Sequence, residues 1–368
     1  MKYKFEDIIF NITEKKKPVE EDKYNYIGLE HLESGNLFIS KWGSDTAPEG
    51  EKIVMKKGDV LFGKRRAYQK KVAISPIDGI FSAHGMVLRP KEDVICKEFL
   101  PFFISSETFL NEAIRISVGG LSPTVNWKDI REQEFDLPSL AEQKVLAEKL
   151  WAAYEVKQSY LKMIAATEEM VKAQFIEDFR DKNPNGCIRD MVETDIKSVK
   201  KSFIADDVIE YIDISSIDAV SHSIKETTTH VVKSAPSRAQ QCVRYGDILV
   251  STVRPINRNI AVVTNDAANL VASTGFCVLR PKENFTEYLL SVTTSDKYTE
   301  AMCDKASGGL YPAVNNSDVL SYKVYIPDEE TLKKVSALYK QADKSISELR
   351  KSVDAIDKVI KSLINENL

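Results

Sequence analysis

The chain has 368 residues, of which 43% are hydrophobic and 29% charged, a balance that is ordinary for a folded globular protein. This length is too great for one compact domain of usual size, so we expect two domains plus connecting helices. The net charge of -4 gives no general sign of a nucleic-acid binder, although cations concentrate in one short segment. No apolar run approaches the ~18 residues of a membrane span, and acids interrupt the first ten residues. We therefore expect a cytoplasmic protein with no membrane partner.

The five cysteines and four histidines exclude two further classes. The cysteines are odd in number, far apart and form no C-x-x-C pair, which argues against a disulfide framework. The histidines have no companion at metal-ligand spacing. We expect no metal site.

In chain order, β-branched and apolar runs between Gly, Asp, Pro and Asn breakers predict strands. Helical patterns follow the last strand of each half at 98–116 and 287–305, and long helices follow at 139–182 and from 327 to the end of the chain. The dipeptides of the NPNGC segment, 183–187, predict the turn between the halves. The strands are expected in segments 26–29, 53–63, 71–76 and 84–90 of the first half, and 208–215, 227–232, 246–252, 259–264 and 275–281 of the second.

The chain repeats once at about half its length. Six motifs recur in the same order, with offsets from 183 (Asp7 to Asp190) to 191 (Glu92 to Glu283). They include GDVL and GDIL, VLRPKE in both halves, and GGLSPTVN matched by GGLYPAVN. The expected fold class is therefore α+β: a mixed α/β module followed by a long helix, used twice.

Both long helices carry a heptad seam, which predicts that they pair with each other as an antiparallel coiled coil. The alternative is that each packs on its own module or on another protein. Gln143 and Lys157 interrupt the first seam, which we interpret as a face turned toward another protein. The seam positions are Gln143, Leu146, Leu150, Ala153, Lys157, Tyr160, Ile164, Thr167, Val171 and Gln174, then Leu332, Val335, Tyr339, Ala342, Ile346, Leu349, Val353, Ile356, Ile360 and Leu363.

A basic segment follows the GDVL strand, and its counterpart at 251–260 places Arg254 where the first copy has Arg66. Cations and amides at a strand end can reach phosphates and base edges, so we interpret both segments as DNA contacts. A solvated basic hairpin is the alternative. The candidates are Lys64, Arg65, Arg66, Tyr68, Lys70 and Lys71 in the first copy, and Arg254, Asn257, Arg258 and Asn259 in the second.

The GGL segments, 119–129 and 308–318, are the second candidate. Their glycines permit close backbone approach, and Asn can bind adenine in the major groove. A tight turn into the closing strand and helix is an equal alternative. The candidates are Gly119, Gly120, Asn126, Lys128, Gly308, Gly309, Tyr311 and Asn315.

A third candidate is the segment 234–241, where Arg238 precedes the GDIL strand. A surface helix is the alternative. Signatures of catalysis are missing: we find no P-loop, no nucleophile motif, no magnesium-type carboxylate cluster, and no methyltransferase loop or cofactor turn. We expect no catalytic residue and no cofactor bound by this chain.

The ordered double occurrence of G-D-[VI]-L, V-L-R-P and GGL-x-P-x-V-N, each followed by a Pro-led long helix, resembles the specificity subunits of type I restriction-modification systems. This resemblance implies target recognition domains at 1–138 and 183–326, and spacer helices at 139–182 and 327–368. Each domain would read one half of a bipartite, asymmetric double-stranded DNA target.

The resemblance also implies partners. Two modification (methyltransferase) subunits would dock on the helices and bind S-adenosylmethionine, and restriction subunits that use ATP and Mg²⁺ could join them. A competing hypothesis is a coiled-coil scaffold that binds proteins and not DNA. Salt-dependent DNA binding would separate the two, because phosphate contacts weaken steeply with salt.

Overall fold

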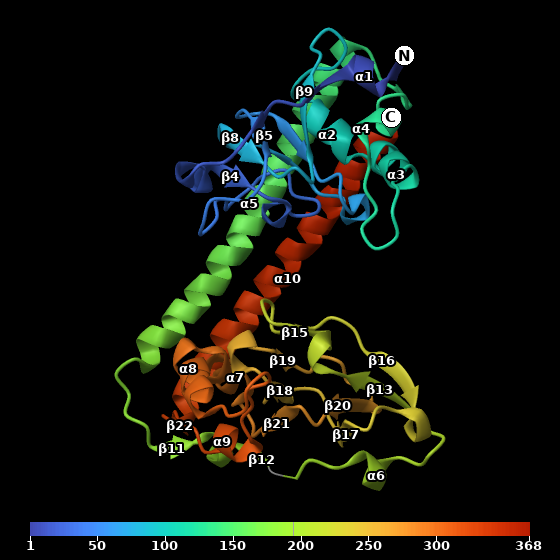
Figure 1. Cartoon of the computed structure of the whole chain (residues 1–368). Helices are drawn as coiled ribbons and strands as arrows, with labels where there is room; N and C mark the ends of the chain where they lie inside the picture. Colours follow the sequence, from blue (N-terminus) through green and yellow to red (C-terminus); the bar gives the residue numbers. More distant parts are fainter. Residues whose placement is uncertain (194) are drawn as a thin grey trace. The chain divides into compact units, whose positions relative to one another are not determined.

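The computed structural model describes residues 1–193 and 195–368, and the chain divides into two compact units. Unit 1 comprises Met1–Met163 and Leu349–Leu368, and unit 2 comprises Ile164–Glu348. Each unit contains one copy of the sequence repeat together with a segment of each long helix (Figure 1).

Unit 1 has two four-stranded sheets, ordered β2-β9-β6-β7 and β3-β5-β8-β4, and a two-stranded sheet of β1 and β10. Short helices follow β9, and α5 leaves the unit after β10. The elements are β1 (Lys2–Lys4), α1 (Phe5–Ile8), β2 (Ile9–Ile12), β3 (Lys15–Lys16), β4 (Tyr26–Ile27), β5 (Lys52–Met55), β6 (Val60–Phe62), β7 (Val72–Ile74), β8 (Gly79–Phe81), β9 (Met86–Pro90), α2 (Leu100–Ser105), α3 (Glu107–Arg115), α4 (Trp127–Ile130), β10 (Glu134–Asp136) and α5 (Leu140–Phe179).

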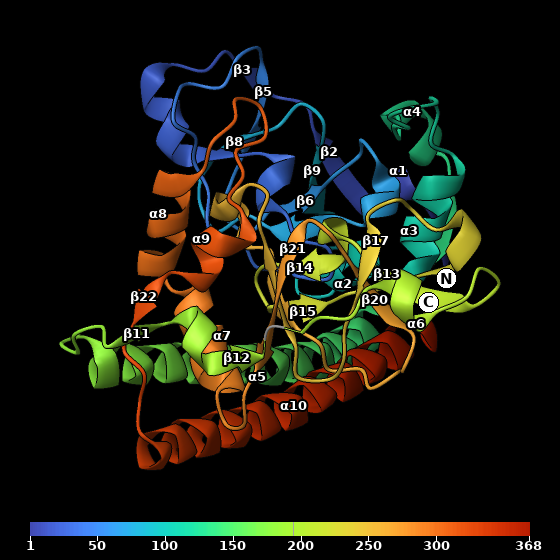
Figure 2. The same ribbon diagram turned by 90° about the horizontal axis from the view of Figure 1, so that it is seen from below.

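Unit 2 has sheets ordered β12-β21-β18-β19 and β16-β13-β20-β17, and two-stranded sheets β11-β22 and β14-β15. Helices α7 and α8 lie together beside the first of these sheets (Figures 1 and 2). The elements are β11 (Gly186–Cys187), β12 (Val192–Glu193), α6 (Val199–Ser202), β13 (Val208–Ile212), β14 (Ile217–Asp218), β15 (Ser223–Ile224), β16 (Thr228–Val231), β17 (Ala239–Cys242), β18 (Ile248–Ser251), β19 (Ile260–Val262), β20 (Leu270–Ser273), β21 (Phe276–Pro281), α7 (Thr286–Thr294), α8 (Asp296–Lys305), α9 (Asn316–Leu320), β22 (Lys323–Val324) and α10 (Glu329–Asn365).

The G-D-[VI]-L and V-L-R-P motifs form the two central strands of the first sheet in each unit, β6 with β9 and β18 with β21. Alternate residues of these strands face opposite sides. Val60 and Phe62 pack toward the helices, whereas Leu61 packs toward the second sheet. The motif strands read as nearly continuous apolar runs because both of their faces are buried.

The predicted helices after the V-L-R-P strands are each two helices. Ser106 accepts a hydrogen bond from the Phe109 amide and begins α3, and Ser295 accepts one from the Tyr298 amide and begins α8. A serine that caps a helix N-terminus stops the preceding helix, and the periodicity of the apolar residues did not reveal this break.

An Asp–Arg pair joins the two motif strands in each unit. Arg89 donates two hydrogen bonds of 2.8 Å to the Asp59 carboxylate. Arg280 donates bonds of 2.9 and 2.8 Å to Asp247. The Asp of G-D-[VI]-L and the Arg of V-L-R-P therefore recur because they bind each other within the fold.

Within each unit, one end of α5 packs with the opposite end of α10, which confirms the antiparallel pairing. In unit 1, Leu150 near the start of α5 shares a core cluster with Ile364 at the end of α10. In unit 2, Phe179 at the end of α5 packs on the cluster that contains Leu332 at the start of α10. None of the predicted seam positions of α10 is exposed, and only Gln174 is exposed in α5.

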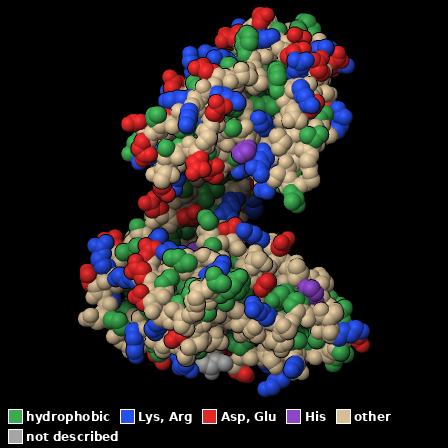
Figure 3. Space-filling view, viewed as in Figure 1, with side chains coloured by type: hydrophobic (Ala, Val, Ile, Leu, Met, Phe, Trp, Pro, Cys, Tyr) green, Lys and Arg blue, Asp and Glu red, His purple; other side chains and the backbone are tan. Residues whose placement is uncertain are grey.

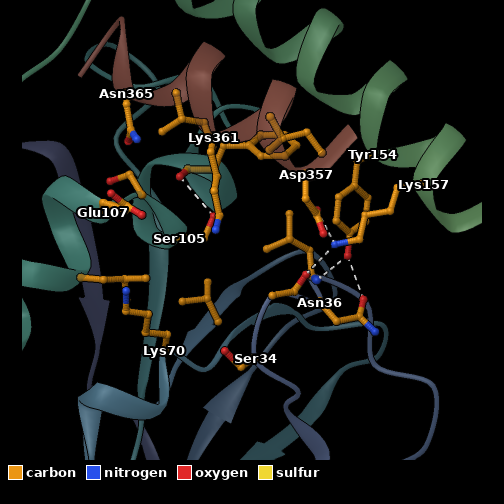
Figure 4. Close-up of a pocket in the computed structure, with 18 residues that line it drawn as sticks. Ser34, Asn36, Lys70, Ser105, Glu107, Tyr154, Lys157, Asp357, Lys361 and Asn365 are labelled. Atoms are coloured by element: carbon orange, nitrogen blue, oxygen red, sulfur yellow. Dashed lines mark hydrogen bonds and ion pairs between the residues drawn. The ribbon is translucent and has the colours of Figure 1, made fainter. Parts of the chain in front are cut away.

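The interpretation of Gln143 and Lys157 as a face turned toward another protein is wrong. The buried Gln143 amide donates to the Val94 carbonyl and accepts from the Cys96 amide, both at 2.9 Å. The Lys157 ammonium lies 2.7 Å from the Asp357 carboxylate of α10. Figure 4 shows this pair at a cavity of about 230 Å³ in unit 1. Both polar residues are seam positions whose partners lie inside the unit.

The helices give no indication of a membrane segment. No helix within residues 1–193 and 195–368 is long and apolar enough to cross a bilayer.

Candidate nucleic-acid interface

The basic loop of unit 1 connects β6 to β7, and its counterpart in unit 2 connects β18 to β19. In unit 1 the loop bends through left-handed residues at Arg66 (φ 57°) and Lys70 (φ 51°). In unit 2 it does so at Arg254 (φ 49°) and Arg258 (φ 51°). This conformation is uncommon for Arg and Lys, so its recurrence at matched positions shows that the two loops share one backbone shape.

Each basic loop is hydrogen-bonded to the GGL loop of its own unit. The Arg66 amide donates to the Pro123 carbonyl at 2.7 Å, and the Val125 amide donates to Lys64 at 3.0 Å. In unit 2 the Arg254 amide donates to the Pro312 carbonyl at 2.7 Å. Two candidate segments far apart in the sequence therefore form one surface in each unit.

In unit 1, this surface is cationic around Arg65. One Arg65 guanidinium nitrogen lies 3.3 Å from His84 Nε2, and another donates to Ser122 of the GGL loop at 3.4 Å. Partial burial lowers the pKa of His84, and the charge of Arg65 lowers it further. Burial and then the charge of Lys15 lower the pKa of Lys64. Figure 3 shows Lys and Arg side chains gathered beside a histidine on this unit.

Two of the five unit 1 cations, Lys70 and Lys71, lie against the fold. The Lys71 ammonium donates to the Leu29 carbonyl at 2.7 Å. Lys70 lines the cavity of Figure 4. Arg66 and Tyr68 are exposed at the loop surface. The arginines, rather than the whole run, are therefore the best placed to meet a polyanion.

In unit 2, the loop is less cationic than its sequence suggests. Arg254 stacks over the Tyr311 ring at 4.5 Å and donates to the Leu310 carbonyl at 3.1 Å. Arg258 forms an ion pair of 2.7 Å with Asp296 of α8. Asn257 is exposed at the loop surface, whereas the Asn259 carbonyl accepts from the Ser251 amide. A stacked guanidinium beside an exposed ring suits contact with a base as well as with a phosphate.

The GGL loops are tight, as the turn alternative predicted. Val118 and Thr124 exchange backbone hydrogen bonds across the base of the unit 1 loop, and Ser307 and Ala313 do the same in unit 2. Gly119 (φ 115°) and Gly308 (φ 108°) hold conformations that favour glycine. Gly120 and Gly309 have ordinary φ angles and open space around them.

The asparagines that close the GGL motifs lie at helix starts. Asn126 precedes α4 and donates from its amide to Asp129 at 3.1 Å. Asn315 accepts from the Asp318 amide at 3.0 Å as the N-cap of α9. Their recurrence therefore has a structural explanation. Lys128 is exposed in the first turn of α4.

The third segment lies partly in a strand. Its last residues form β17, so the surface-helix alternative is wrong. The Arg238 carbonyl accepts a hydrogen bond from the Thr274 amide. The carbonyl of Gly275, the residue after Thr274, accepts one from the amide of Thr252 at the start of the basic loop. Arg238 is therefore joined by backbone contacts to the end of the sheet that carries the other candidates.

A lysine group near β17 was missed by the sequence reasoning. The Lys197 carbonyl accepts a hydrogen bond from the Cys242 amide, and Ser198 forms an isolated antiparallel β-bridge with Gln241. Lys197, Lys200 and Lys201 are all exposed. Their spacing in KSVKKS is a usable sequence signal, but it has no counterpart in the first copy of the repeat.

The described parts of the chain, which omit residue 194, contain no group of His, Cys, Asp and Glu that could hold a metal ion. What recurs in both units is a pair of pinned loops that carries arginine, amide and aromatic side chains. This defines a class of paired α/β modules, each of which carries a basic loop beside a GGL loop and is attached to a long helix.

The comparisons with known proteins agree with this class. Residues 2–159 match the model of the family described as the type I restriction modification DNA specificity domain. The type I restriction enzyme HindI specificity subunit of Haemophilus influenzae is 31% identical over 137 residues, 36% of this chain. That match spans 30% of the relative's own length. The resemblance to type I specificity subunits is confirmed.

Two solved structures show the same fold over the whole chain. The type I restriction-modification S subunit from M. genitalium has a TM-score of 0.51 at 13% identity, covering 99% of this chain and 94% of that one. A chain from a study of the assembly and conformational transition of the type I R-M system also has a TM-score of 0.51, at 18% identity, with coverage of 100% and 97%. The predicted fold class is confirmed.

Proposed function

We propose that this chain is the DNA sequence-specificity subunit of a type I restriction-modification enzyme. The observation that carries the proposal is the recurrence of one surface, a basic loop hydrogen-bonded to a GGL loop, in both units. The match of residues 2–159 to the specificity domain family supports it.

In this proposal each unit reads one half of a bipartite target. The framework of each surface is shared, but its side chains differ, with Arg65 beside His84 in one unit and Arg254 over Tyr311 in the other. Two unlike surfaces suit an asymmetric target, because sequence is read by the side chains that reach base edges. The paired α5 and α10 set the distance between the half-sites, as protein geometry sets half-site spacing in dimeric repressors.

The chain itself performs no chemistry in this proposal. It binds DNA in the cytoplasm and positions two modification subunits, which bind S-adenosylmethionine; restriction subunits bring ATP and Mg²⁺. A feature that supports docking is the solvent-facing side of α5, where Val156, Met163 and Met170 are exposed at steps of seven. Exposed apolar residues at heptad spacing are typical of a helix that meets another helix.

The same apolar positions favour the second candidate, a scaffold that binds proteins but not DNA. A salt titration separates the two: the chain purified with a modification subunit is mixed with duplex DNA at increasing salt. The specificity subunit should bind with a steep negative salt slope, whereas a scaffold should show no DNA binding at any salt concentration.

A domain exchange tests the bipartite reading. Methylome sequencing first gives the target in a host that expresses the chain with its modification subunit. Residues 1–138 are then replaced by the matching segment of another specificity subunit. One half of the methylated motif should change while the other half and the spacer stay; a change in both halves, or in neither, would contradict the proposal.

A further inference from the structure

Two leucines in the GGL loops have side chains that are almost fully exposed to solvent. Leu121 is 97% exposed, and Leu310 at the matched position of unit 2 is 85% exposed. Single exposed apolar residues are normal on protein surfaces. Two leucines at the same position of two repeats, each at the tip of a pinned loop, form a pattern that calls for a physical cause.

The loops present these leucines on a constrained backbone. Two backbone hydrogen bonds close the base of each loop, and a left-handed glycine turns the chain just before the tip. A third bond fixes each loop to the neighbouring basic loop, through Pro123 in unit 1 and Pro312 in unit 2. The loop tip of unit 1 lies between α3 and α4. A loop held in this way loses little backbone conformational freedom when a ligand buries its tip.

Cations flank both leucines. Arg65 donates to Ser122, the residue after Leu121, at 3.4 Å. Arg254 donates to the carbonyl of Leu310 itself at 3.1 Å. The ligand that buries these leucines must therefore offer an apolar slot next to negative charge. The stacked base pairs of DNA, flanked by phosphates, have this chemistry.

We propose that Leu121 and Leu310 are wedges that enter between adjacent base pairs and unstack them, one in each half of the target. The proposal rests on the DNA-binding function above and adds a mechanism to it. The neighbouring arginines hold the phosphates beside the opened step, so the energy of those contacts offsets the cost of unstacking. Base steps differ in how easily they unstack, so the wedge favours some sequences over others without a polar contact to the bases.

The test uses the full chain bound to a modification subunit and duplexes that carry 2-aminopurine, whose fluorescence rises when it unstacks, at each position of the target in turn. The wild-type complex should raise the fluorescence at one step in each half-site. Leu121→Ala should abolish the rise in one half-site only, and Leu310→Ala in the other. Each loss of a buried leucine should weaken binding about tenfold. Leu121→Phe, which keeps an apolar wedge, should retain the signal.

Matched controls truncate exposed apolar side chains elsewhere, at Val19 in unit 1 and at Tyr245, at the opposite end of β18 from the basic loop. They should leave both signals unchanged, and thermal unfolding should match wild type for all variants. Normal DNA binding by the leucine variants with an unchanged fluorescence profile overturns the wedge but not the proposed function. Loss of subunit assembly with intact unstacking also overturns it, since the leucines would then contact protein. A wild-type complex that does not bind DNA overturns both proposals.

Discussion

Units 1 and 2 share a framework and differ at its edges. The sheets β2-β9-β6-β7 and β12-β21-β18-β19 have the same order, and the parallel pair β4-β8 recurs as β13-β20. The fourth strand of the second sheet differs: β3 adds to the β5 edge in unit 1, whereas β16 adds to the β13 edge in unit 2. The central strands hold the matched motifs, whereas the strand added at the edge of the second sheet and the side chains of the loop surfaces differ.

The largest expected difference between the units concerns the Asp–Arg pairs. In unit 2 the Asp247 and Arg280 side chains are 1% and 10% exposed, whereas in unit 1 Asp59 and Arg89 are 4% and 37% exposed. Asp247→Ala should cost about 3 to 5 kcal/mol, because it leaves a buried guanidinium unpaired. Asp59→Ala should cost about 1 to 3 kcal/mol, since solvent screens Arg89. Amide hydrogen exchange of peptides from β18 and β21 and from β6 and β9 measures the loss of unfolding free energy in each unit.

A double variant is the control for this prediction. Combining Asp247→Ala with Arg280→Met removes both charges, so part of the lost protection should return. Equal losses of protection in the two single variants would show that burial does not distinguish the units.

The cationic loops are expected to differ in salt dependence. Arg65→Gln with Arg66→Gln should reduce the slope of log affinity against log salt by about 2, because each arginine neutralises one phosphate. Arg254→Gln with Arg258→Gln should reduce it by only about 1, since Arg258 already pairs with Asp296. Titration of the complex with target DNA at several salt concentrations measures both slopes.

Lys97→Gln, which removes a cation from the chain before α2, is the matched control and should leave the slope unchanged. Equal reductions by the two arginine pairs would show that the Asp296 ion pair opens when DNA binds. An unchanged slope for the Arg65 and Arg66 variant would remove the unit 1 loop from the interface.

A smaller effect is expected where α5 meets α10 in unit 1. The Lys157 side chain is 12% exposed and Asp357 is 39% exposed, so Lys157→Ala should cost about 1 kcal/mol. The corresponding seam position of α10 is Ile346, which indicates that this site accepts an apolar residue. Lys157→Leu with Asp357→Leu should therefore keep or raise the protection of α5 amides against exchange; a loss as large as that of Lys157→Ala would show that the ion pair specifies the register.

The smallest effect compares the buried thiols of the two units. Burial raises the pKa of Cys96 in unit 1 and raises that of Cys277 in unit 2 to about 12. Both should react with iodoacetamide more slowly than Cys187, Cys242 and Cys303 in the native chain at pH 8, as peptide mass spectrometry can measure. Because the pKa of a buried thiol is raised, the thiol stays neutral in the folded chain at a pH where it loses its proton in the unfolded chain. The free energy of unfolding therefore falls as pH rises above the ordinary thiol pKa. Fast labelling of Cys277 would contradict its burial.

Much of the fold could be predicted because it depends on local sequence patterns. The alternation and repetition of GDVL and VLRP predicted central strands, and the heptads predicted a helix pair that the burial of α10 confirms. The heptad register predicts that Gln174 lies in the seam, but Gln174 is exposed and its neighbour Phe175 packs on the unit 2 core. A fixed heptad step drifts relative to the 3.6-residue turn of a straight helix, so the end of a long seam is its least reliable part.

Three features could be predicted from periodicity and residue type alone: the duplication of the chain, the strands at the centre of each half, and the need of both long helices for partners. The folded chain was needed to show three other features. Asp59 binds Arg89, Gln143 and Lys157 have internal partners, and each basic loop is hydrogen-bonded to a GGL loop. The reason is physical: such contacts join residues far apart in the chain, and their geometry exists only after the sheets and helices have packed.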